Sequence, residues 1–118
     1  MLSLATTDRP VIIRAMLEHI RARLDAYEPA LIEGQDLARA AVLLPLYDVD
    51  GELRVLFTRR SEMVEHHKGQ ISFPGGAHDA TDPDLAYTAI RETWEEIGVE
   101  AAHVELVGQL DEMITIAH

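Results

Sequence analysis

The chain has 118 residues, carries a formal net charge of −11 and contains no cysteine. Its length suits one small domain with a hydrophobic core, and an apolar fraction of 47% is ordinary for a folded protein. The negative charge argues against broad nucleic-acid binding, which depends on clustered Lys and Arg. Without cysteine, disulfides, thiolate metal ligands and thiol nucleophiles are excluded, so only oxygen and imidazole ligands remain.

The sequence also predicts a cytoplasmic protein that does not associate with a membrane. No apolar run reaches transmembrane length, and the N-terminus lacks the charged start and long apolar stretch of a secretory signal. The basic residues are nevertheless unevenly placed, since four of the ten lie just before a glycine turn: Arg54, Arg59, Arg60 and Lys68. Such a patch suits an anionic small molecule, above all with a divalent cation, although each residue alone is also explained as solvated surface.

The first predicted element is an amphipathic helix that starts near Asp8 and Pro10. Its apolar residues recur at steps of three and four: Ile13, Leu17, Ile20 and Leu24. Residues 40–47 then form a continuous apolar run, which predicts one strand buried on both faces, with an edge or bulge near Pro45. Asp50-Gly51 is a turn signal and residues 53–58 resume a strand pattern, so residues 40–59 predict a β-hairpin, followed by a short strand at 71–73.

A glycine turn and an acidic helix follow, in the stretch FPGGAHDATDPDLAYTAIRETWEEIGV at residues 73–99. Thr81 or Asp82 is the expected cap, Pro83 is expected in the first turn, and Gly98 is expected to end the helix in a left-handed conformation. The helical wheel predicts that one apolar face anchors the helix, with Trp94 as a core residue rather than a stacking platform. That face comprises Ala86, Ile90, Trp94 and Ile97.

The opposite face of this helix carries Glu92, Glu95 and Glu96. Two of these glutamates crowd the C-terminal turn, where the helix dipole disfavours negative charge, so a cation is expected nearby. The plain alternative is a solvated face of an amphipathic helix. Two more strands are predicted at 104–110 and 114–116, and the abrupt apolar ending predicts either sequence beyond His118 or packing against a partner, such as a second copy of the chain.

The glycine turn and the acidic helix, up to Val99, resemble the Nudix box, in which Arg-Glu, an apolar position and Glu-Glu precede a final Gly and an aliphatic residue. The matching positions are Gly76, Arg91, Glu92, Glu95, Glu96, Gly98 and Val99. The interval from Gly76 to Arg91 is one residue longer than the general pattern, which brings the first Glu position to Asp82 or Pro83, and Thr93 occupies the usual apolar position.

The longer interval and the preceding stretch LFTRRSEMVEHHKGQISFPGG resemble the coenzyme A diphosphatase branch of that family. Glu65 departs from this branch, which usually has an Arg there. The resemblance implies an α/β (α+β) fold of the Nudix type, with a mixed β-sheet sandwiched between helices and the later C-terminal elements missing. It divides the chain into an N-terminal helical extension at 1–36 and a Nudix hydrolase domain at 37–118.

The resemblance also implies a site for Mg²⁺ or Mn²⁺, hard cations that prefer oxygen ligands. Its metal ligands would be Glu92, Glu95, Glu96 and the backbone of Gly76. Catalysis would rest on Glu95 and Glu96, with Arg91 orienting the glutamates. The candidate substrate contacts are Arg59, Arg60, His67, Lys68 and Gly75. For His78, beside the glycine turn, an ordinary loop position is favoured over a catalytic role.

Three functions remain open at this point. The first is metal-dependent hydrolysis of the phosphoanhydride of coenzyme A or acyl-CoA to 3′,5′-ADP and 4′-phosphopantetheine or its acylated form. The second keeps this chemistry but takes ADP-ribose, a dinucleotide or another nucleoside diphosphate derivative, and Glu65 keeps it open. The third is a nucleotide-binding Nudix module that has lost turnover.

Overall fold

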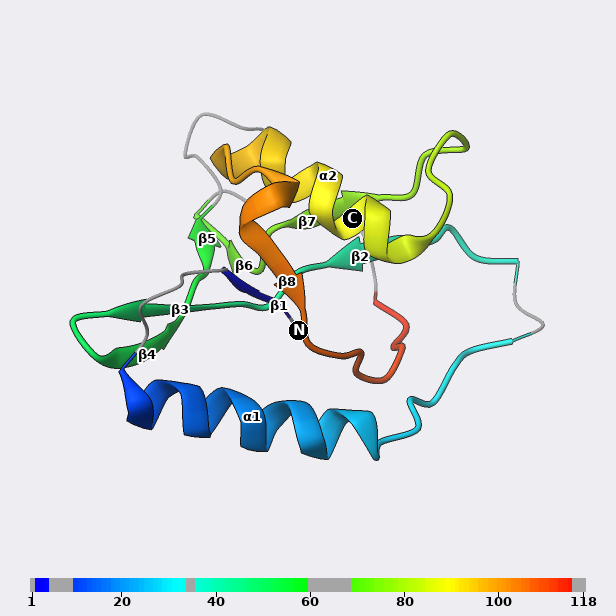
Figure 1. Ribbon diagram of the computed structural model, residues 1–118. Coiled ribbons are helices and arrows are strands. Elements are labelled where there is room, and N and C mark those ends of the chain that lie inside the picture. The colour runs from blue at the N-terminus through cyan, green and yellow to red at the C-terminus, as the bar shows by residue number, and fades with distance from the viewer. Residues whose placement is uncertain (1, 5–9, 34–35, 60–68, 116–118) are drawn as a thin grey trace.

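The structure is a computed structural model that describes residues 2–4, 10–33, 36–59 and 69–115. Figure 1 shows helix α1 along one edge of the molecule and α2 along the opposite edge, with the strands between them. This mixed α+β arrangement agrees with the predicted fold class. In chain order the elements are β1 (Leu2–Leu4), α1 (Val11–Asp25), β2 (Ala40–Val42), β3 (Pro45–Val49), β4 (Glu52–Val55), β5 (Thr58–Arg59), β6 (Ile71–Ser72), β7 (Gly75–Ala77), α2 (Leu85–Ile97), the 3₁₀ helix η1 (Ala101–His103) and β8 (Val104–Leu106).

The largest sheet in the described part of the chain is mixed and has the strand order β4-β3-β1-β8. Strand β1 runs parallel to β3 and antiparallel to β8. Strands β3 and β4 form the predicted hairpin, and its turn residues Asp50 and Gly51 have φ angles of 52° and 80°. Positive φ at both positions is typical of the type I′ turn, which explains the Asp-Gly pair.

The prediction of one continuous strand at 40–47 was wrong. Strand β2 pairs with β7, whereas β3 belongs to the larger sheet, and the break at Leu43 and Leu44 directly precedes Pro45. Proline lacks an N–H group and restricts the residue before it, so a strand readily begins there. The Leu43 N–H instead donates to the carbonyl of Pro74, and its buried side chain packs against Ala89 of α2. One apolar run therefore serves two sheets.

Helix α1 confirms the predicted amphipathic helix, with Pro10 at its N-cap. Ile13 and Leu17 are one turn apart, so both reach Leu46 of β3 and form a buried cluster with it. This cluster fixes α1 against the larger sheet. Within the described residues, no helix has the length and apolar character needed to cross a membrane.

Helix α2 begins later than predicted, at Leu85, and its cap is Asp84, whose side chain accepts from the N–H of Tyr87. The expected caps Thr81 and Asp82 are engaged elsewhere, and Pro83 lies before the helix rather than in its first turn. Gly98 ends the helix at a φ of 73°, which confirms the predicted left-handed cap.

The apolar face predicted for α2 was wrong in part. The buried residues of α2 are Thr88, Ala89 and Thr93, while Trp94 is 56% exposed and Ala86 is exposed as well. Threonine tolerates this burial because its hydroxyl finds partners within the protein, such as the bond from Thr93 to the Ala89 carbonyl. The helix therefore packs on β2 and β7 through a face of small side chains, which allows a close approach.

The C-terminal part contains less strand than predicted, because β8 ends at Leu106 and residues 107–115 are irregular. The Asp111 carboxylate accepts from the Tyr27 hydroxyl and from the Ala30 N–H, and the Glu112 N–H donates to the Ala30 carbonyl. These bonds tie the segment to the loop after α1 rather than to a strand. Ile116, the end of the second predicted strand, lies outside the described residues.

Candidate functional site

The loop before α2 folds so that the Asp82 carboxylate points into the protein. The Asp82 carboxylate accepts a hydrogen bond from the N–H of Asp79, and the N–H of Asp82 donates to the Asp79 carbonyl. The Asp79 carboxylate accepts from the N–H and the hydroxyl of Thr81, and these bonds lower the pKa of Asp79. The side chain of Asp82 is only 1% exposed as a result. A carboxylate this buried requires strong partners.

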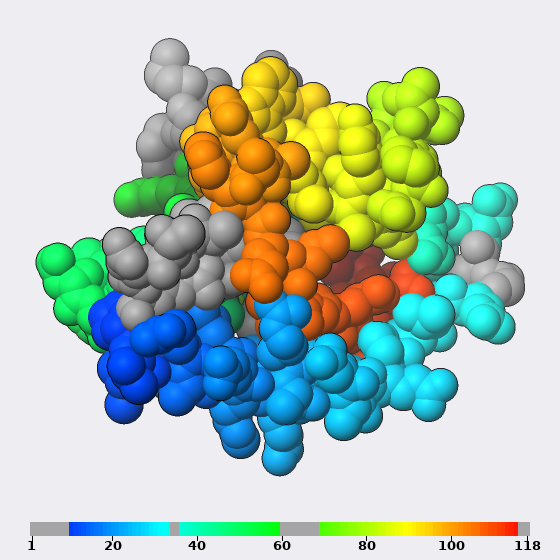
Figure 2. All heavy atoms as spheres, in the orientation of Figure 1, coloured from blue at the N-terminus to red at the C-terminus, as the bar shows by residue number. Residues whose placement is uncertain are grey.

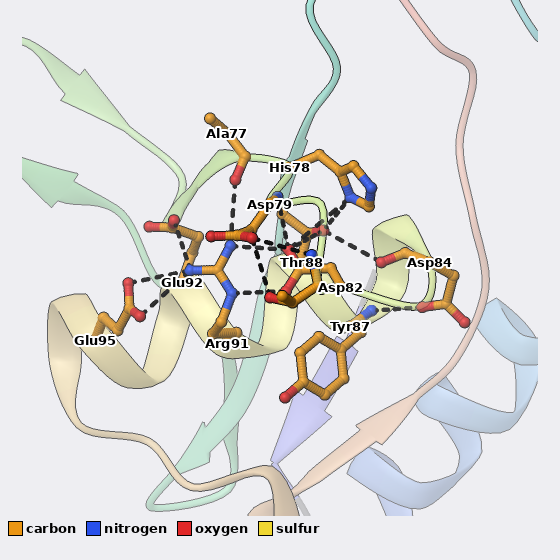
Figure 3. Close-up of polar contacts among 11 residues, drawn as sticks. Ala77, His78, Asp79, Asp82, Asp84, Tyr87, Thr88, Arg91, Glu92 and Glu95 are labelled. Atoms are coloured by element: carbon orange, nitrogen blue, oxygen red, sulfur yellow. Dashed lines mark hydrogen bonds and ion pairs between the residues drawn. The ribbon is translucent and has the colours of Figure 1, made fainter.

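Arg91 is the centre of the site, as Figure 3 shows. Its Nε and Nη2 donate to the two carboxylate oxygens of Asp82, each at 2.9 Å, in the bidentate geometry that suits a guanidinium. Its Nη1 donates to Glu92 at 3.0 Å and to both oxygens of Glu95 at 3.3 Å. Nη2 also reaches the Ala77 carbonyl at 3.2 Å. All five guanidinium N–H groups therefore have partners.

The pKa values of this network follow from these contacts. The hydrogen bonds from Arg91 hold the pKa of Asp82 far below its usual range, and the bonds from Asp79 and Thr88 add to this effect against the opposing influence of burial. In the same way, Asp82 raises the pKa of Arg91, with further contributions from Glu92 and Glu95. The pair is therefore ionised at any ordinary pH.

Glu92 lies directly against the backbone of Gly76 in β7. A Cβ atom placed on Gly76 would be 2.6 Å from the Cδ and one carboxylate oxygen of Glu92, closer than real Cβ atoms approach other atoms. Only glycine leaves this space. At the neighbouring position, a Cβ on Gly75 would lie 2.2 Å from the Ala41 carbonyl oxygen, so Gly75 permits the close pairing of β7 with β2.

The three glutamates of α2 differ in their surroundings. Glu92 is half-buried between Gly76 and Arg91, whereas Glu95 and Glu96 are exposed near the end of the helix. In the described segments, no three Asp, Glu or His side chains converge closely enough to hold a metal ion. Arg91 instead occupies the space between Glu92 and Glu95. The oxygen donors and the glycine backbone beside them nevertheless suit a hard divalent cation.

The predicted substrate contacts are only partly described. Arg59 lies in β5 and is exposed, and Gly75 lies in β7 beside Gly76. The positions of Arg60, His67 and Lys68 fall outside the described residues.

Sequence reasoning missed two residues of this network. It treated Asp82 as a helix cap or as the first acidic position of the motif, not as the bidentate partner of Arg91. The available signal was a carboxylate in the loop directly before a helix whose second turn carries an arginine. Thr88, which donates to Asp82 at 2.8 Å and has no exposed surface, gave no signal beyond being a polar residue at an inward-facing position.

The chain is 45% identical over 87 residues to Nudix hydrolase 3 of Caenorhabditis elegans, a match that covers 73% of this chain and 36% of the relative. It is 49% identical over 74 residues to the mitochondrial coenzyme A diphosphatase NUDT8 of Mus musculus, covering 62% of this chain and 35% of the relative. It is 41% identical over 70 residues to the peroxisomal coenzyme A diphosphatase NUDT7 of Mus musculus, covering 59% of this chain and 30% of the relative.

The chain thus spans about a third of the length of these relatives. The sequence profile of the NUDIX domain matches residues 37–116, which include strand β7 with its two glycines and the whole of the Arg91 network. This match extends over well more than half of the chain and agrees with the mixed α+β fold. The chain therefore belongs to the Nudix hydrolase family.

Proposed function

We propose that this chain carries the catalytic carboxylates of a metal-dependent diphosphatase that hydrolyses the phosphoanhydride of coenzyme A or acyl-CoA. The products would be 3′,5′-ADP and 4′-phosphopantetheine or its acylated form. The observation that carries the proposal is the arrangement of Glu92 and Glu95, which one guanidinium holds together beside the bare backbone of Gly76. Hydrolysis of a diphosphate uses a divalent cation to neutralise charge on the phosphate oxygens, and carboxylates are the ligands that would hold such a cation.

The proposed metal is Mg²⁺ or Mn²⁺, with Glu92, Glu95, Glu96 and the Gly76 backbone as the residues that would hold it. When bound, such an ion neutralises phosphate oxygens and makes water a better nucleophile. The protein residues do the positioning: Arg91 fixes the glutamate carboxylates, and Asp82 fixes Arg91 through two hydrogen bonds. Glu92 and Glu96 are the first proposed metal ligands, and Glu95 is proposed either to coordinate the ion or to hold the attacking water.

Coenzyme A is the proposed substrate on the ground of sequence similarity. The stretch before the glycine turn resembles the signature of the coenzyme A diphosphatase branch, and two of the relatives named above are coenzyme A diphosphatases. Arg59, exposed on β5, is the proposed contact for the phosphate-bearing part of such a substrate. The second candidate is ADP-ribose or another nucleoside diphosphate derivative, which Glu65 favours because it replaces the usual Arg of that branch.

The remaining assignments are proposals of the same kind. We place the hydrolase domain at residues 37–118, with residues 1–36 as a helical extension. The small-molecule substrate is the proposed partner, without nucleic acid or membrane, and a homodimer is the proposed assembly. A cytoplasmic location is likewise proposed, whereas relatives of this chain carry mitochondrial and peroxisomal names.

The test of the proposal is a product assay. The protein is incubated with coenzyme A, ADP-ribose and a dinucleotide polyphosphate, each with Mg²⁺ or Mn²⁺, and the products are identified. We expect cleavage of coenzyme A that stops when the metal is chelated. Cleavage of ADP-ribose alone would favour the second candidate, and a folded protein without any metal-dependent cleavage would contradict both, leaving a binding module.

Two variants test the carboxylates. Glu95→Gln and Glu96→Gln remove charge but little volume, so each is expected to lower turnover by about a hundredfold or more with the fold intact. Glu100→Gln is the matched control, because Glu100 is exposed just beyond the helix, and it should keep full activity. If both helix variants remain fully active, the proposed metal site is wrong.

A further inference from the structure

A chain of hydrogen bonds connects a loop histidine to Arg91. His78 directly follows β7, its side chain is 30% exposed, and its Nδ1 lies 2.9 Å from the hydroxyl of Thr88. That hydroxyl lies 2.8 Å from the buried carboxylate of Asp82, which binds Arg91. Figure 3 shows these side chains converging from the loop and the first turns of α2. The catalytic proposal gives His78 and Thr88 no role.

The direction of the bond between His78 and Thr88 follows from counting hydrogens. The Thr88 hydroxyl has one hydrogen, and it has two neighbours that can only accept: the Asp82 carboxylate at 2.8 Å and the Asp84 carbonyl at 3.2 Å. Asp82 stays ionised beside Arg91, so it offers no hydrogen in return. The hydroxyl must therefore accept from His78, and the ring must carry a hydrogen on Nδ1.

We propose that His78 is a positioning residue of the site, which donates from Nδ1 to Thr88 and thereby fixes the Thr88 hydroxyl toward Asp82. Asp82 in turn fixes Arg91, and Arg91 holds Glu92 and Glu95. The backbone of His78 is itself anchored, because its N–H donates to the Arg39 carbonyl at 2.9 Å. The claim that this network positions catalytic carboxylates rests on the proposed function, whereas the hydrogen bond between His78 and Thr88 does not.

The first test reads the histidine ring directly and needs no turnover. The ¹⁵N NMR shifts of the His78 ring are recorded at a pH where the ring is neutral. We expect hydrogen on Nδ1 and a bare Nε2 in the unmodified protein. Thr88→Val keeps the shape of the side chain but removes the acceptor, so this preference should disappear. Hydrogen on Nε2 in the unmodified protein would overturn the proposal.

The second test compares two substitutions of His78 by kinetics. In His78→Asn the amide nitrogen takes the place of Nδ1 and retains the donor, whereas His78→Leu removes it. We expect kcat to fall about tenfold in the leucine variant, equivalent to about 1.4 kcal/mol, with KM unchanged because the network holds carboxylates rather than substrate. The asparagine variant should restore kcat. His19→Leu, on the exposed side of α1, is the control and should match the unmodified protein.

Each outcome of the two tests either supports or contradicts the positioning role of His78. Equal activity of the leucine variant and the unmodified protein, or equal loss in the leucine and asparagine variants, would contradict the positioning role while leaving the proposed hydrolysis in place. If the protein cleaves none of the substrates, the proposed function fails, and the ring shifts alone then decide the inference. If the leucine variant does not fold, the asparagine variant and Thr88→Val still give the answer.

Discussion

Substitution of Gly76 by alanine should inactivate the site without unfolding the protein. The added Cβ would lie 2.6 Å from the Cδ of Glu92. Carbon atoms normally stay about 3.5–4.0 Å apart, so the Glu92 carboxylate must move by about 1 Å. The movement falls on Glu92 because its carboxylate is the flexible end of a side chain, whereas Gly76 is held in β7 by its pairing with β2.

The size of the effect follows from how accurately a metal ligand must be placed. Metal–ligand distances are held to within about 0.2 Å, and a misplacement of about 1 Å near the chemistry can lower a rate by about a hundredfold. We therefore expect Gly76→Ala to lower metal-dependent turnover by about a hundredfold. The assay is steady-state hydrolysis of whichever substrate the unmodified protein cleaves, with thermal unfolding measured in parallel. The melting temperature should change little.

Two other glycines provide matched controls. In Gly75→Ala the Cβ meets the backbone of β2, which cannot yield, so this variant should lose the fold. At Gly98 a Cβ would meet no atom within 4 Å, but φ is 73°, so Gly98→Ala should cost about 1 kcal/mol of stability and leave turnover unchanged. Full activity of Gly76→Ala would refute the role of Glu92. Unfolding of Gly76→Ala would refute the argument that Glu92 absorbs the overlap.

Two further predictions concern the network and the exposed tryptophan. Because the folded pKa of Asp82 lies below its ordinary value of 3.8, its contribution to stability is complete above that pH and is lost as pH falls through the folded value. Asp82→Asn should therefore lower the melting temperature relative to the unmodified protein at neutral pH, and this lowering should become smaller below pH 3.8. The control Asp36→Asn, at an exposed position, should leave the melting temperature unchanged. A lowering by Asp82→Asn that stays constant with pH would contradict the prediction. Trp94→Ala should cost less than about 1 kcal/mol in urea unfolding, since Trp94 is 56% exposed. A loss of about 3–5 kcal/mol would mean that Trp94 is a core residue after all.

The sequence predicted the elements that a local rule decides. The Asp50-Gly51 turn and the Gly98 cap depend on the φ angles that these residues accept, and both are where the pattern placed them. The helix of residues 11–25 was predictable because its apolar residues repeat at the period of the helix. The family resemblance depended on a motif confined to one turn and one helix.

The incorrect predictions concern choices between distant partners. Asp82 is a good cap in isolation, but it binds Arg91 instead, and Asp84 takes its place. A helical wheel places Trp94 on the predicted core face of α2. The face that packs on β2 and β7 is instead lined by Thr88 and Thr93, because small buried side chains let the helix approach the strands closely. A wheel counts apolar residues and cannot measure the space that a particular neighbour leaves.

The full engagement of Arg91 has a consequence for the order in which ligands bind. Three carboxylates, those of Asp82, Glu92 and Glu95, face one guanidinium, so the ionised network retains two negative charges, the amount that one divalent cation balances. Arg91 has no spare N–H to offer a phosphate, and an anion that approached first would meet net repulsion. The charge balance therefore favours an ordered mechanism in which the cation enters before an anionic substrate.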